Sequence, residues 1–535
     1  MISDEPLLVD TGKGFSVKWR NRFLYSSRDP KGSVLRRAKA QNLEEDTLYL
    51  IPSPLLGYGM DYLLEQLPSG SFILGVERFQ ELMASTQIYL PEELLKGENC
   101  SIIRTENITA AAEFVSSLGW ERFKRCRRIE LTGGSRLDSG YYQSLEEELN
   151  RRIFTYWQTR ASLVRMGPLW FRNIFRNIPA LSQGKTLSSL KVKGSLMLCG
   201  AGESLELSLP MIKENRENLF LCTVDTAYPV LLSRGIVPDA VFNLDGQFYN
   251  FYDYYQHRGE KVFLISDITS FPQSLRLPGV EPLYFSSHFA DNDLLSHLES
   301  ASLLPHSIAP LGSVGVTALH LCTQISEGPI ILSGLDFSYQ PGKSHARGSI
   351  YHQLFLSWTK RLLPDGGMTE LSLKRPAREA LGQLTGKKLR SDVVLEGYFH
   401  SFKELLSLHK ERCYQLAWDF PSHQVPLLKG EELGKLTKEL GKPTIVLSDS
   451  EDLSALWKDF LTEEIAGLES VLKAWDIYNR YNDALPLTEA LSSCDYLTIT
   501  LGIDKNDGEE LYYTGAVKNA RLYHSYAKQA LLSLS

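Results

Sequence analysis

The segment from Leu196 to Asp245 constrains the fold most, because three short apolar runs alternate there with helix-like segments. The runs are Leu196–Cys199, Leu219–Val224 and Ala240–Leu244. An alternation of strand and helix predicts a parallel sheet. Ligands of such sheets bind at the carboxyl ends of the strands, so the residues that follow these runs are the first candidates for a functional site.

A chain of 535 residues is too long for a single hydrophobic core, so we expect several domains. The predicted class is α/β, with two Rossmann-like parallel sheets and a helical C-terminal region. The expected parts are an N-terminal Rossmann-like domain (1–140), a helical connector (141–193), a central parallel-sheet domain (194–410) and a helical C-terminal domain (411–535). In the connector, apolar residues at helical spacing predict a helix that ends before Pro179.

Charge and cysteine content narrow the classes of function. The net charge of -7 argues against broad binding to nucleic acid or anionic membranes. The seven cysteines form no C-x-x-C pair, so we predict no cysteine metal site and a reducing compartment. The sequence shows no signal peptide, and no apolar run reaches the roughly 20 residues of a membrane span. We therefore expect a cytoplasmic protein.

The first candidate site is the turn Gly200-Ala201-Gly202-Glu203-Ser204, which follows a predicted strand and precedes a predicted helix. Gly200 and Gly202 would let the backbone come close to a ligand, and the free N–H groups of the helix start favour a phosphate. Ser204 would either donate to a phosphate oxygen or cap the helix. A tight turn that binds nothing is the alternative for the whole motif.

Two aspartates end the next two predicted strands. Carboxylates at strand ends bind ribose hydroxyls or metal ions in many parallel sheets. For Asp225, a helix N-cap is an equally good interpretation. For Asp245, we favour a site role because Asn243 and Gly246 flank it and aromatic residues follow.

A third group of candidates lies between residues 312 and 347. Gly312 and Ser313 precede a predicted helix and would cradle a phosphate or sugar, with ordinary capping as the alternative. Asp336 ends a predicted strand, and His345 follows in a loop with Lys343 and Arg347. A histidine titrates near neutrality and therefore suits proton transfer, although a loop histidine can equally be a solvated surface residue.

Taken together, these motifs resemble the bacterial motility accessory factor family, whose core domain is shared with 6-hydroxymethylpterin pyrophosphokinase-like proteins. The resemblance rests on CGAGESL, VDTAYPVLLSRGIVPDAVFNLD, LGSVGVTALHLC, PIILSGLDFSY and KSHARG, in this order, and on LYSSRDP and FRNIFRNIP upstream. It covers residues from about 20 to about 410. The chain departs from the family in three places: Glu203 stands where a proline is usual, and Ser53 and Leu55 replace two of three alternating glycines.

The resemblance implies a sialyltransferase-like central domain. Gly200, Gly202 and Ser204 would hold the phosphate and ribose of a CMP-sugar, and Gly312 and Ser313 would add contacts to this donor. Asp225 and Asp245 would face nucleotide or sugar. Asp336 and His345 would lie near the sugar and the acceptor as catalytic residues. Because two glycines are replaced in the N-terminal unit, a scaffold or partner-binding role is favoured there.

The function expected from this resemblance is transfer of a nonulosonic acid, of pseudaminic or legionaminic type, from a CMP-sugar to Ser or Thr of flagellin, in support of motility. The reaction would invert the anomeric centre, with His345 as the base. No resident cofactor or metal is assigned, but Mg²⁺ is kept as an alternative. Two other functions stay open: an ATP-dependent hydroxymethylpterin pyrophosphokinase using Mg²⁺ through Asp245 or Asp336, and a non-enzymatic flagellin-binding protein.

Overall fold

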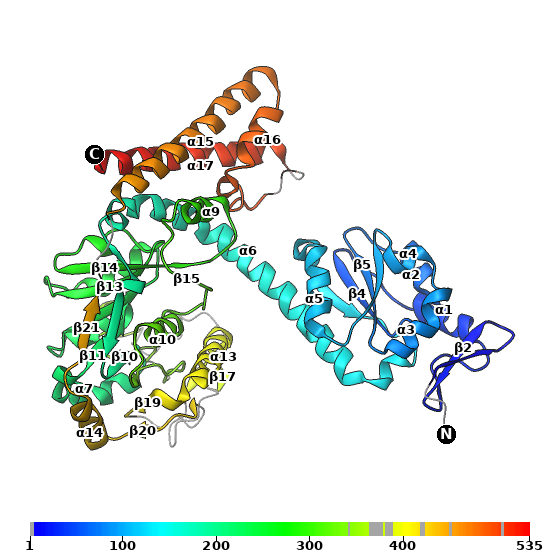
Figure 1. Ribbon diagram of the computed structural model, residues 1–535, viewed down its shortest axis with the longest axis horizontal. Helices are drawn as coiled ribbons and strands as arrows, with labels where there is room; N and C mark the ends of the chain where they lie inside the picture. Colours follow the sequence, from blue (N-terminus) through cyan, green and yellow to red (C-terminus); the bar gives the residue numbers. More distant parts are fainter. Residues whose placement is uncertain are drawn as a thin grey trace. The chain divides into compact units, whose positions relative to one another are not determined.

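The computed structural model describes residues 5–340, 343–362, 378–379, 389–417, 423–448, 452–503, 505 and 508–534. The chain divides into two compact units, Met1–Ser162 and Leu163–Ser535. Each unit contains a parallel sheet flanked by helices (Figure 1), which confirms the predicted α/β class and the multidomain organisation. The four predicted domain boundaries stay a prediction.

The N-terminal unit begins with a small antiparallel sheet of β1 (Leu7–Asp10), β2 (Phe15–Trp19) and β3 (Arg22–Phe23). The main sheet has the order β6-β5-β4-β7, and all its pairs are parallel. Its strands are β4 (Thr47–Pro52), β5 (Phe72–Glu77), β6 (Cys100–Arg104) and β7 (Arg125–Arg128). The helices of this unit are α1 (Pro30–Lys39), α2 (Met60–Glu65), α3 (Gln80–Thr86), α4 (Glu92–Lys96) and α5 (Ile108–Ser117).

The turn after β4 has left-handed backbone angles at two residues that are not glycine. Ser53 has φ 46°, Leu55 has φ 53° and Gly57 has φ 70°. The Ser53 hydroxyl donates to Glu77 Oε2 over 2.7 Å, and the Leu55 side chain is fully buried. A non-glycine residue in this region costs on the order of 1–3 kcal/mol, which the surrounding contacts must offset. The turn is thus filled and bonded by its own side chains.

The central sheet of the second unit has the order β15-β14-β13-β12-β11-β10-β16-β19-β20, with β8 paired to β14 and every pair parallel. Its strands are β8 (Lys185–Thr186), β10 (Leu196–Cys199), β11 (Phe220–Val224), β12 (Ala240–Asn243), β13 (Val262–Asp267), β14 (Val280–Ser287), β15 (Ser307–Ile308), β16 (Ile330–Ser333), β19 (Cys413–Leu416) and β20 (Leu427–Leu428).

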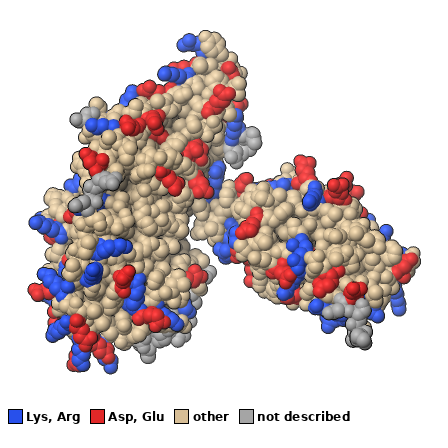
Figure 2. All heavy atoms as spheres, in the orientation of Figure 1, with Lys and Arg blue, Asp and Glu red and all other residues tan. Residues whose placement is uncertain are grey.

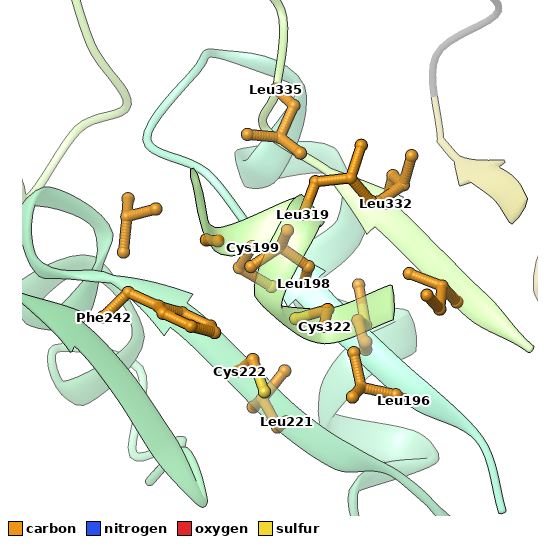
Figure 3. Packing of buried hydrophobic residues seen from close by; sticks show 14 of the residues in the cluster. Leu196, Leu198, Cys199, Leu221, Cys222, Phe242, Leu319, Cys322, Leu332 and Leu335 are labelled. Atoms are coloured by element: carbon orange, nitrogen blue, oxygen red, sulfur yellow. The ribbon is translucent and has the colours of Figure 1, made fainter. Parts of the chain in front are cut away.

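Side chains alternate between the two faces of this sheet, so each face has its own core. Phe242 and Ile265 belong to the cluster that contains the buried residues of α7 (Ser204–Glu214), α10 (Val314–Ile325) and α13 (Val393–Leu408). Figure 3 shows this packing around β10 and β11. Val241 and Leu264 belong to the second cluster, with the buried residues of α6 (Ser139–Leu181), α9 (Asp293–Ser300), α15 (Ser454–Tyr481) and α17 (Glu509–Ser533). The burial of both faces explains why β10–β12 are continuous apolar runs.

The long helix α6 (Ser139–Leu181) runs from one unit into the other. The prediction that it ends before Pro179 is wrong, because the helix includes Pro168 and Pro179 and continues to Leu181. A proline removes only its own hydrogen bond to the fourth residue before it, a cost that burial of the helix can offset. The buried residues Ile174, Phe175 and Ile178 hold this last part of the helix in the core.

The region after residue 411 is less purely helical than the sequence suggests. Strands β19 and β20 extend the central sheet, and β21 (Thr444–Leu447) pairs antiparallel with β9 (Leu190–Lys193). β19 (CYQL) includes a polar residue and β20 has only two residues, so neither shows the uninterrupted apolar run that indicates a strand at β10. The remaining helices are α8 (Tyr228–Leu232), α9 (Asp293–Ser300), α11 (Ile350–Trp358), α14 (Gly430–Leu440), α15 (Ser454–Tyr481), α16 (Leu485–Leu491) and α17 (Glu509–Ser533).

Charged side chains of both signs are interspersed on the face drawn in Figure 2. This distribution agrees with the modest net charge of -7. Among the described residues, no helix has both the length and the apolar character that crossing a membrane requires.

Candidate functional site

The strand order of the central sheet reverses direction at β10, which lies between β11 and β16. At such a switch point the loops after the two central strands usually separate and leave a crevice for a ligand. Here they interlock instead. Gly200 N donates to Ser333 O and Gly202 N donates to Gly334 O, each over 2.8 Å. The two loops therefore form one bonded floor at the carboxyl edge of the sheet.

The glycines of these loops are required by the closeness of the two backbones. A Cβ atom on Gly200 would lie 2.3 Å from Gly334 O, and one on Gly202 would lie 2.5 Å from Asp336 Cγ. A Cβ atom on Gly334 would lie 2.1 Å from Gly200 O, and Gly334 has φ 70°. The glycines predicted to bind phosphate are thus required for the packing of one loop against the other. Their role in phosphate binding stays a prediction.

Asp336 bonds directly to Ser204. Its Oδ2 accepts the Ser204 N–H over 2.8 Å, its Oδ1 accepts the Ser204 hydroxyl, and that hydroxyl accepts Gly334 N–H over 2.9 Å. Burial raises the pKa of Asp336 to about 6, while the bonds from Ser204 act in the opposite direction. The start of α7 is therefore already occupied by a carboxylate of the protein. The catalytic role of Asp336 also stays a prediction.

The loop with Lys343 and His345 docks on the start of α7. Lys343 Nζ lies 3.2 Å from Glu203 Oε1 and 2.7 Å from Glu206 Oε1, and Ala346 N donates to Ala201 O over 2.8 Å. Glu203 thus shares the charge of Lys343 with Glu206. The negative charge of Glu203 beside the glycine turn is therefore paired within the protein.

Three aspartates cluster at the neighbouring strand ends: Asp225 after β11, Asp245 after β12, and Asp253 in the 3₁₀ segment η7 (Phe248–Tyr254). We call them the acidic cluster. Burial raises the pKa of Asp225 to about 7, and the charge of Asp245 adds to this effect. Burial also raises the pKa of Asp245. The structure therefore brings together two aspartates that the sequence analysis selected separately.

Asp253 is the member that sequence reasoning missed. Its side chain is 1% exposed, and its Oδ1 has no hydrogen-bond partner among the described residues. Burial, and then the charges of Asp225 and Asp245, raise the pKa of Asp253 to about 9. The sequence signal that could have identified Asp253 is an acidic residue within the aromatic run Phe248–Tyr254. A buried carboxyl group without a partner is costly, which points to a group that a ligand completes.

His345 and Tyr351 adjoin the acidic cluster. Their rings stack with centroids 4.9 Å apart and an interplanar angle of 15°. Burial, and then the charges of Asp253, Asp225 and Asp245, raise the pKa of Tyr351 to about 12. Burial lowers the pKa of His345 to about 4, and its Nδ1 lies 3.0 Å from the Ser344 hydroxyl. The imidazole is therefore neutral at physiological pH and has a nitrogen that can accept a proton.

Gly312 and Ser313 precede α10, as predicted. Gly312 has φ 75°, which favours glycine, and a Cβ atom there would lie 3.1 Å from the Tyr398 ring. Ser313 occupies the N-cap position of α10, but its hydroxyl makes no capping hydrogen bond. The first N–H groups of α10 thus lack a side-chain cap. No contact among the described residues joins this helix start to the acidic cluster.

In chemical terms, the site offers protonated and ionised carboxyls, a neutral imidazole and a phenol at one edge of the sheet. This set can accept and donate hydrogen bonds to the hydroxyl groups of a sugar or ribose and can move a proton. Among the described residues, no group of three or more His, Cys, Asp or Glu side chains is placed to hold a metal ion. The carboxylates interact electrostatically without forming a coordination shell.

A cavity of about 510 Å³ lies elsewhere, between α9, α15 and Ser493–Cys494. Its wall includes Glu464, which pairs with His297 and accepts the Tyr496 hydroxyl over 2.7 Å. These polar groups satisfy one another and tie the helices together. The cavity contains none of the residues that the sequence analysis selected.

Comparison with known proteins adds three findings. Residues 172–342 match the family model described as 6-hydroxymethylpterin diphosphokinase MptE-like. An uncharacterized protein of Treponema pallidum (strain Nichols) is 30% identical over 415 residues, which cover 76% of this chain and 71% of that protein. A second uncharacterized protein of the same strain is 22% identical over 206 residues, covering 34% of this chain and 52% of that protein.

A solved structure is also similar over nearly the whole chain. It is the structure of MAf glycosyltransferase from Magnetospirillum magneticum AMB-1, with a TM-score of 0.55, 13% sequence identity, and coverage of 99% of this chain and 91% of that chain. At this level of identity the likeness concerns the fold. It extends beyond the matched core, to the N-terminal sheet and the C-terminal helices.

Proposed function

Because the chain belongs to the motility accessory factor family with an MptE-like core, we propose that it is a cytoplasmic, inverting glycosyltransferase. In this proposal the donor is a CMP-activated nonulosonic acid of pseudaminic or legionaminic type. The acceptor is a Ser or Thr hydroxyl of flagellin. The family and the fold support a transferase, and the finer identity of donor and acceptor is our inference.

The observation that carries this proposal is the buried acidic cluster beside a neutral His345. A nucleotide sugar presents many hydroxyl donors, and carboxylates at strand ends accept such donors. Asp225 and Asp245 would accept hydrogen bonds from ribose or sugar hydroxyls. Asp253, whose pKa of about 9 keeps it protonated at neutral pH, would use its orphan oxygen and its proton on the same ligand.

In the transfer step, the acceptor oxygen bonds to the anomeric carbon while the bond from that carbon to the CMP phosphate oxygen breaks. His345 would take the proton of the acceptor hydroxyl. Its pKa of about 4 keeps the imidazole unprotonated over the physiological range, although it also makes the imidazole a weak base. Such a base suits a transition state in which the leaving group departs early and positioning dominates.

The departing phosphate needs hydrogen-bond donors. The uncapped start of α10, with Gly312 and Ser313, would provide them, since free N–H groups at a helix start favour anions. Gly200, Gly202 and Ser204 would form the adjoining wall of the donor pocket. Asp336 would act through Ser204, because both of its oxygens are bonded to that residue.

The direct test is intact-mass analysis of flagellin from cells that carry the wild-type gene, no gene, or a His345→Ala variant. We expect sugar-sized mass increments to disappear in the last two. His352→Ala is the matched control, because this histidine lies on the neighbouring helix α11. Unchanged increments without the gene would refute the proposed function. Unchanged increments in a folded His345→Ala protein would refute only the role of this residue.

A second candidate function follows from the family model that matches residues 172–342, whose description names a diphosphokinase. That reaction would transfer pyrophosphate from ATP to a hydroxymethylpterin and would need Mg²⁺, for which Asp245 or Asp336 would be the ligands. Calorimetry with ATP and Mg²⁺ on one hand, and with CMP and EDTA on the other, separates the two functions. Binding of CMP in EDTA supports the glycosyltransferase.

A further inference from the structure

The sequence Phe171–Ile178, FRNIFRNI, repeats a four-residue pattern within α6. Residues four apart lie on the same side of a helix, so the repeat gives α6 four distinct faces. The phenylalanine face is buried against α17, where the Phe175 and Tyr523 rings stack with centroids 5.7 Å apart. The isoleucine face is buried as well.

The asparagine face is bonded to the carboxyl edge of the sheet. Asn173 Nδ2 donates to Gly246 O over 3.0 Å and to Thr269 O over 2.9 Å. Asn177 Nδ2 donates to Ile268 O and Ser270 O, each over 2.9 Å. The asparagine face of α6 therefore holds the loops that follow β12 and β13 in place.

The arginine face has no comparable partner. It lies between the phenylalanine and asparagine faces, and it contains Arg172 and Arg176. The guanidinium of Arg176 stacks over the Tyr526 ring of α17 at 5.8 Å. The guanidinium of Arg276 joins the group, because its Nη2 donates to Arg176 O over 3.3 Å. Three cations thus gather where α6, α17 and residues 274–276 meet.

Among the described residues, no carboxylate lies within ion-pair distance of these three guanidiniums. Arg172 Nε is buried and lacks a hydrogen-bond partner there. The hydroxyl of Tyr523 is also buried without a partner, and its residue is fully buried. The charge of Arg172 lowers the pKa of Tyr523 against the stronger raising effect of burial, so the two groups are close.

Without a counter-ion, this cluster of arginine side chains is energetically unfavourable. Arginines four residues apart on a helix repel each other, and burial followed by the charges of Arg172 and Arg276 lowers the pKa of Arg176. Buried donors without partners add a desolvation cost. An anion with several acceptor oxygens would reverse each of these effects, since guanidinium and hydroxyl groups are strong donors to phosphate.

We propose that Arg172, Arg176, Arg276 and the Tyr523 hydroxyl form a binding site for a phosphate group, separate in its residues from the acidic cluster. The proposal does not depend on the transferase function. The ligand would be free phosphate or the phosphoryl group of a small phosphomonoester, because both present the same tetrahedral set of oxygens.

The test is titration calorimetry of the full chain with inorganic phosphate and, in a second arm, with glycerol phosphate. We expect saturable binding that Arg172→Met weakens at least about tenfold, since this change removes charged hydrogen bonds but keeps the aliphatic stem. Arg234→Gln is the matched control, an exposed arginine of the same unit that should leave binding unchanged. Equal affinity in both arms indicates free phosphate, and tighter binding of glycerol phosphate indicates a phosphomonoester.

Thermal unfolding in phosphate-free buffer separates this site from a purely structural cluster. Arg172→Met and Tyr523→Phe should keep or raise the Tm, because each removes a buried group without a partner, and both should reduce the rise in Tm that phosphate produces in the wild type. The absence of phosphate binding in the wild type would overturn the proposal. So would an equal rise in Tm from potassium chloride at the same ionic strength, or unchanged phosphate binding in both variants.

Discussion

The buried carboxyl groups beside the two parallel sheets differ in whether both of their oxygens are hydrogen-bonded. In the N-terminal unit, Glu77 ends β5, and burial raises its pKa to about 7. Its two oxygens accept the Ser53 hydroxyl over 2.7 Å and Phe79 N over 3.1 Å. In the central sheet, Asp253 is equally buried, but one of its oxygens has no partner among the described residues. Burial therefore does not distinguish the two carboxyl groups, whereas the unfilled hydrogen bond of Asp253 does.

The same contrast holds for the turns of the two sheets. The turn after β4 has positive φ at Ser53 and Leu55, and the buried Leu55 side chain fills the space. The turn after β10 keeps its glycines because another loop passes within bonding distance. The first turn is filled by its own side chains, and the second is packed against the loop that follows β16.

The largest effect should come from adding a methyl group to this floor. Gly202→Ala would place a Cβ atom 2.5 Å from Asp336 Cγ and 2.8 Å from Gly334 O, so we expect a loss of about 3 kcal/mol in the free energy of unfolding. Urea unfolding measures it. Gly397→Ala on α13 is the control, because nothing lies within 4 Å of its Cβ position and alanine favours a helix. Equal stability of the two variants would show that the floor is not tightly bonded.

A smaller loss of stability is expected when the hydrogen bonds of the Ser204 hydroxyl, which join the two loops, are removed. Ser204→Ala leaves Asp336 Oδ1 and Gly334 N–H without this partner in a buried site, which costs on the order of 2 kcal/mol. Ser407→Ala, which removes a hydroxyl bonded to Glu404 O on an exposed part of α13, should cost less than about 0.5 kcal/mol. Thermal unfolding of both variants provides the comparison. A Tm for Ser204→Ala as high as that of the control would contradict the interlock.

The pH dependence should distinguish Asp253 from Glu77. The folded-state pKa of Asp253 is raised to about 9, so its stabilising effect is complete below about pH 4 and is lost as the pH rises through about 9. Asp253→Asn should therefore be more stable than the wild type above pH 9 and similar to it near pH 4. Urea unfolding at both pH values measures this. A wild type that is the more stable protein at high pH would refute the assignment.

Glu77→Gln is the matched substitution in the other sheet. The carboxyl accepts two hydrogen bonds, and an amide nitrogen cannot replace an accepting oxygen, so this variant should lose about 1–2 kcal/mol near neutral pH. Its affinity for CMP, measured by calorimetry, should equal that of the wild type. Asp253→Asn should weaken CMP binding. The reverse result would move the nucleotide to the N-terminal unit.

The smallest effect is expected at Ser53. Ser53→Gly relieves the strain of a non-glycine residue at φ 46° but removes the hydrogen bond to Glu77. Each of these terms is about 1 kcal/mol and they have opposite signs, so the net change should stay within about 1 kcal/mol. Chemical denaturation followed by tryptophan fluorescence, to which the buried Trp19 of this unit contributes, reports the change. A loss above about 2 kcal/mol would mean that the side chain matters far more than the backbone angle.

Much of the central fold could be read from local sequence. Apolar runs such as Leu196–Cys199 became buried parallel strands, and Asp225 and Asp245 lie at strand ends as expected. The strands β19 and β20 could not be found, because β19 (CYQL) includes a polar residue where β10 (LMLC) is an uninterrupted apolar run, and β20 has only two residues. The continuation of α6 through Pro179 also depends on burial by distant residues, which a local helix rule does not contain.

The candidate site also combines features that the local sequence determines with features that depend on the tertiary structure. The sequence by itself determined which residue types follow each strand: glycines after β10, aspartates after β11 and β12, and a loop with Lys343 and His345. Only the tertiary structure decided that Asp336 fills the start of α7, that Lys343 pairs with Glu203, and that Asp253 joins the acidic cluster. The reason is physical. Strand and turn preferences act between neighbours in the chain, whereas desolvation and charge pairing depend on atoms that folding brings together from far apart.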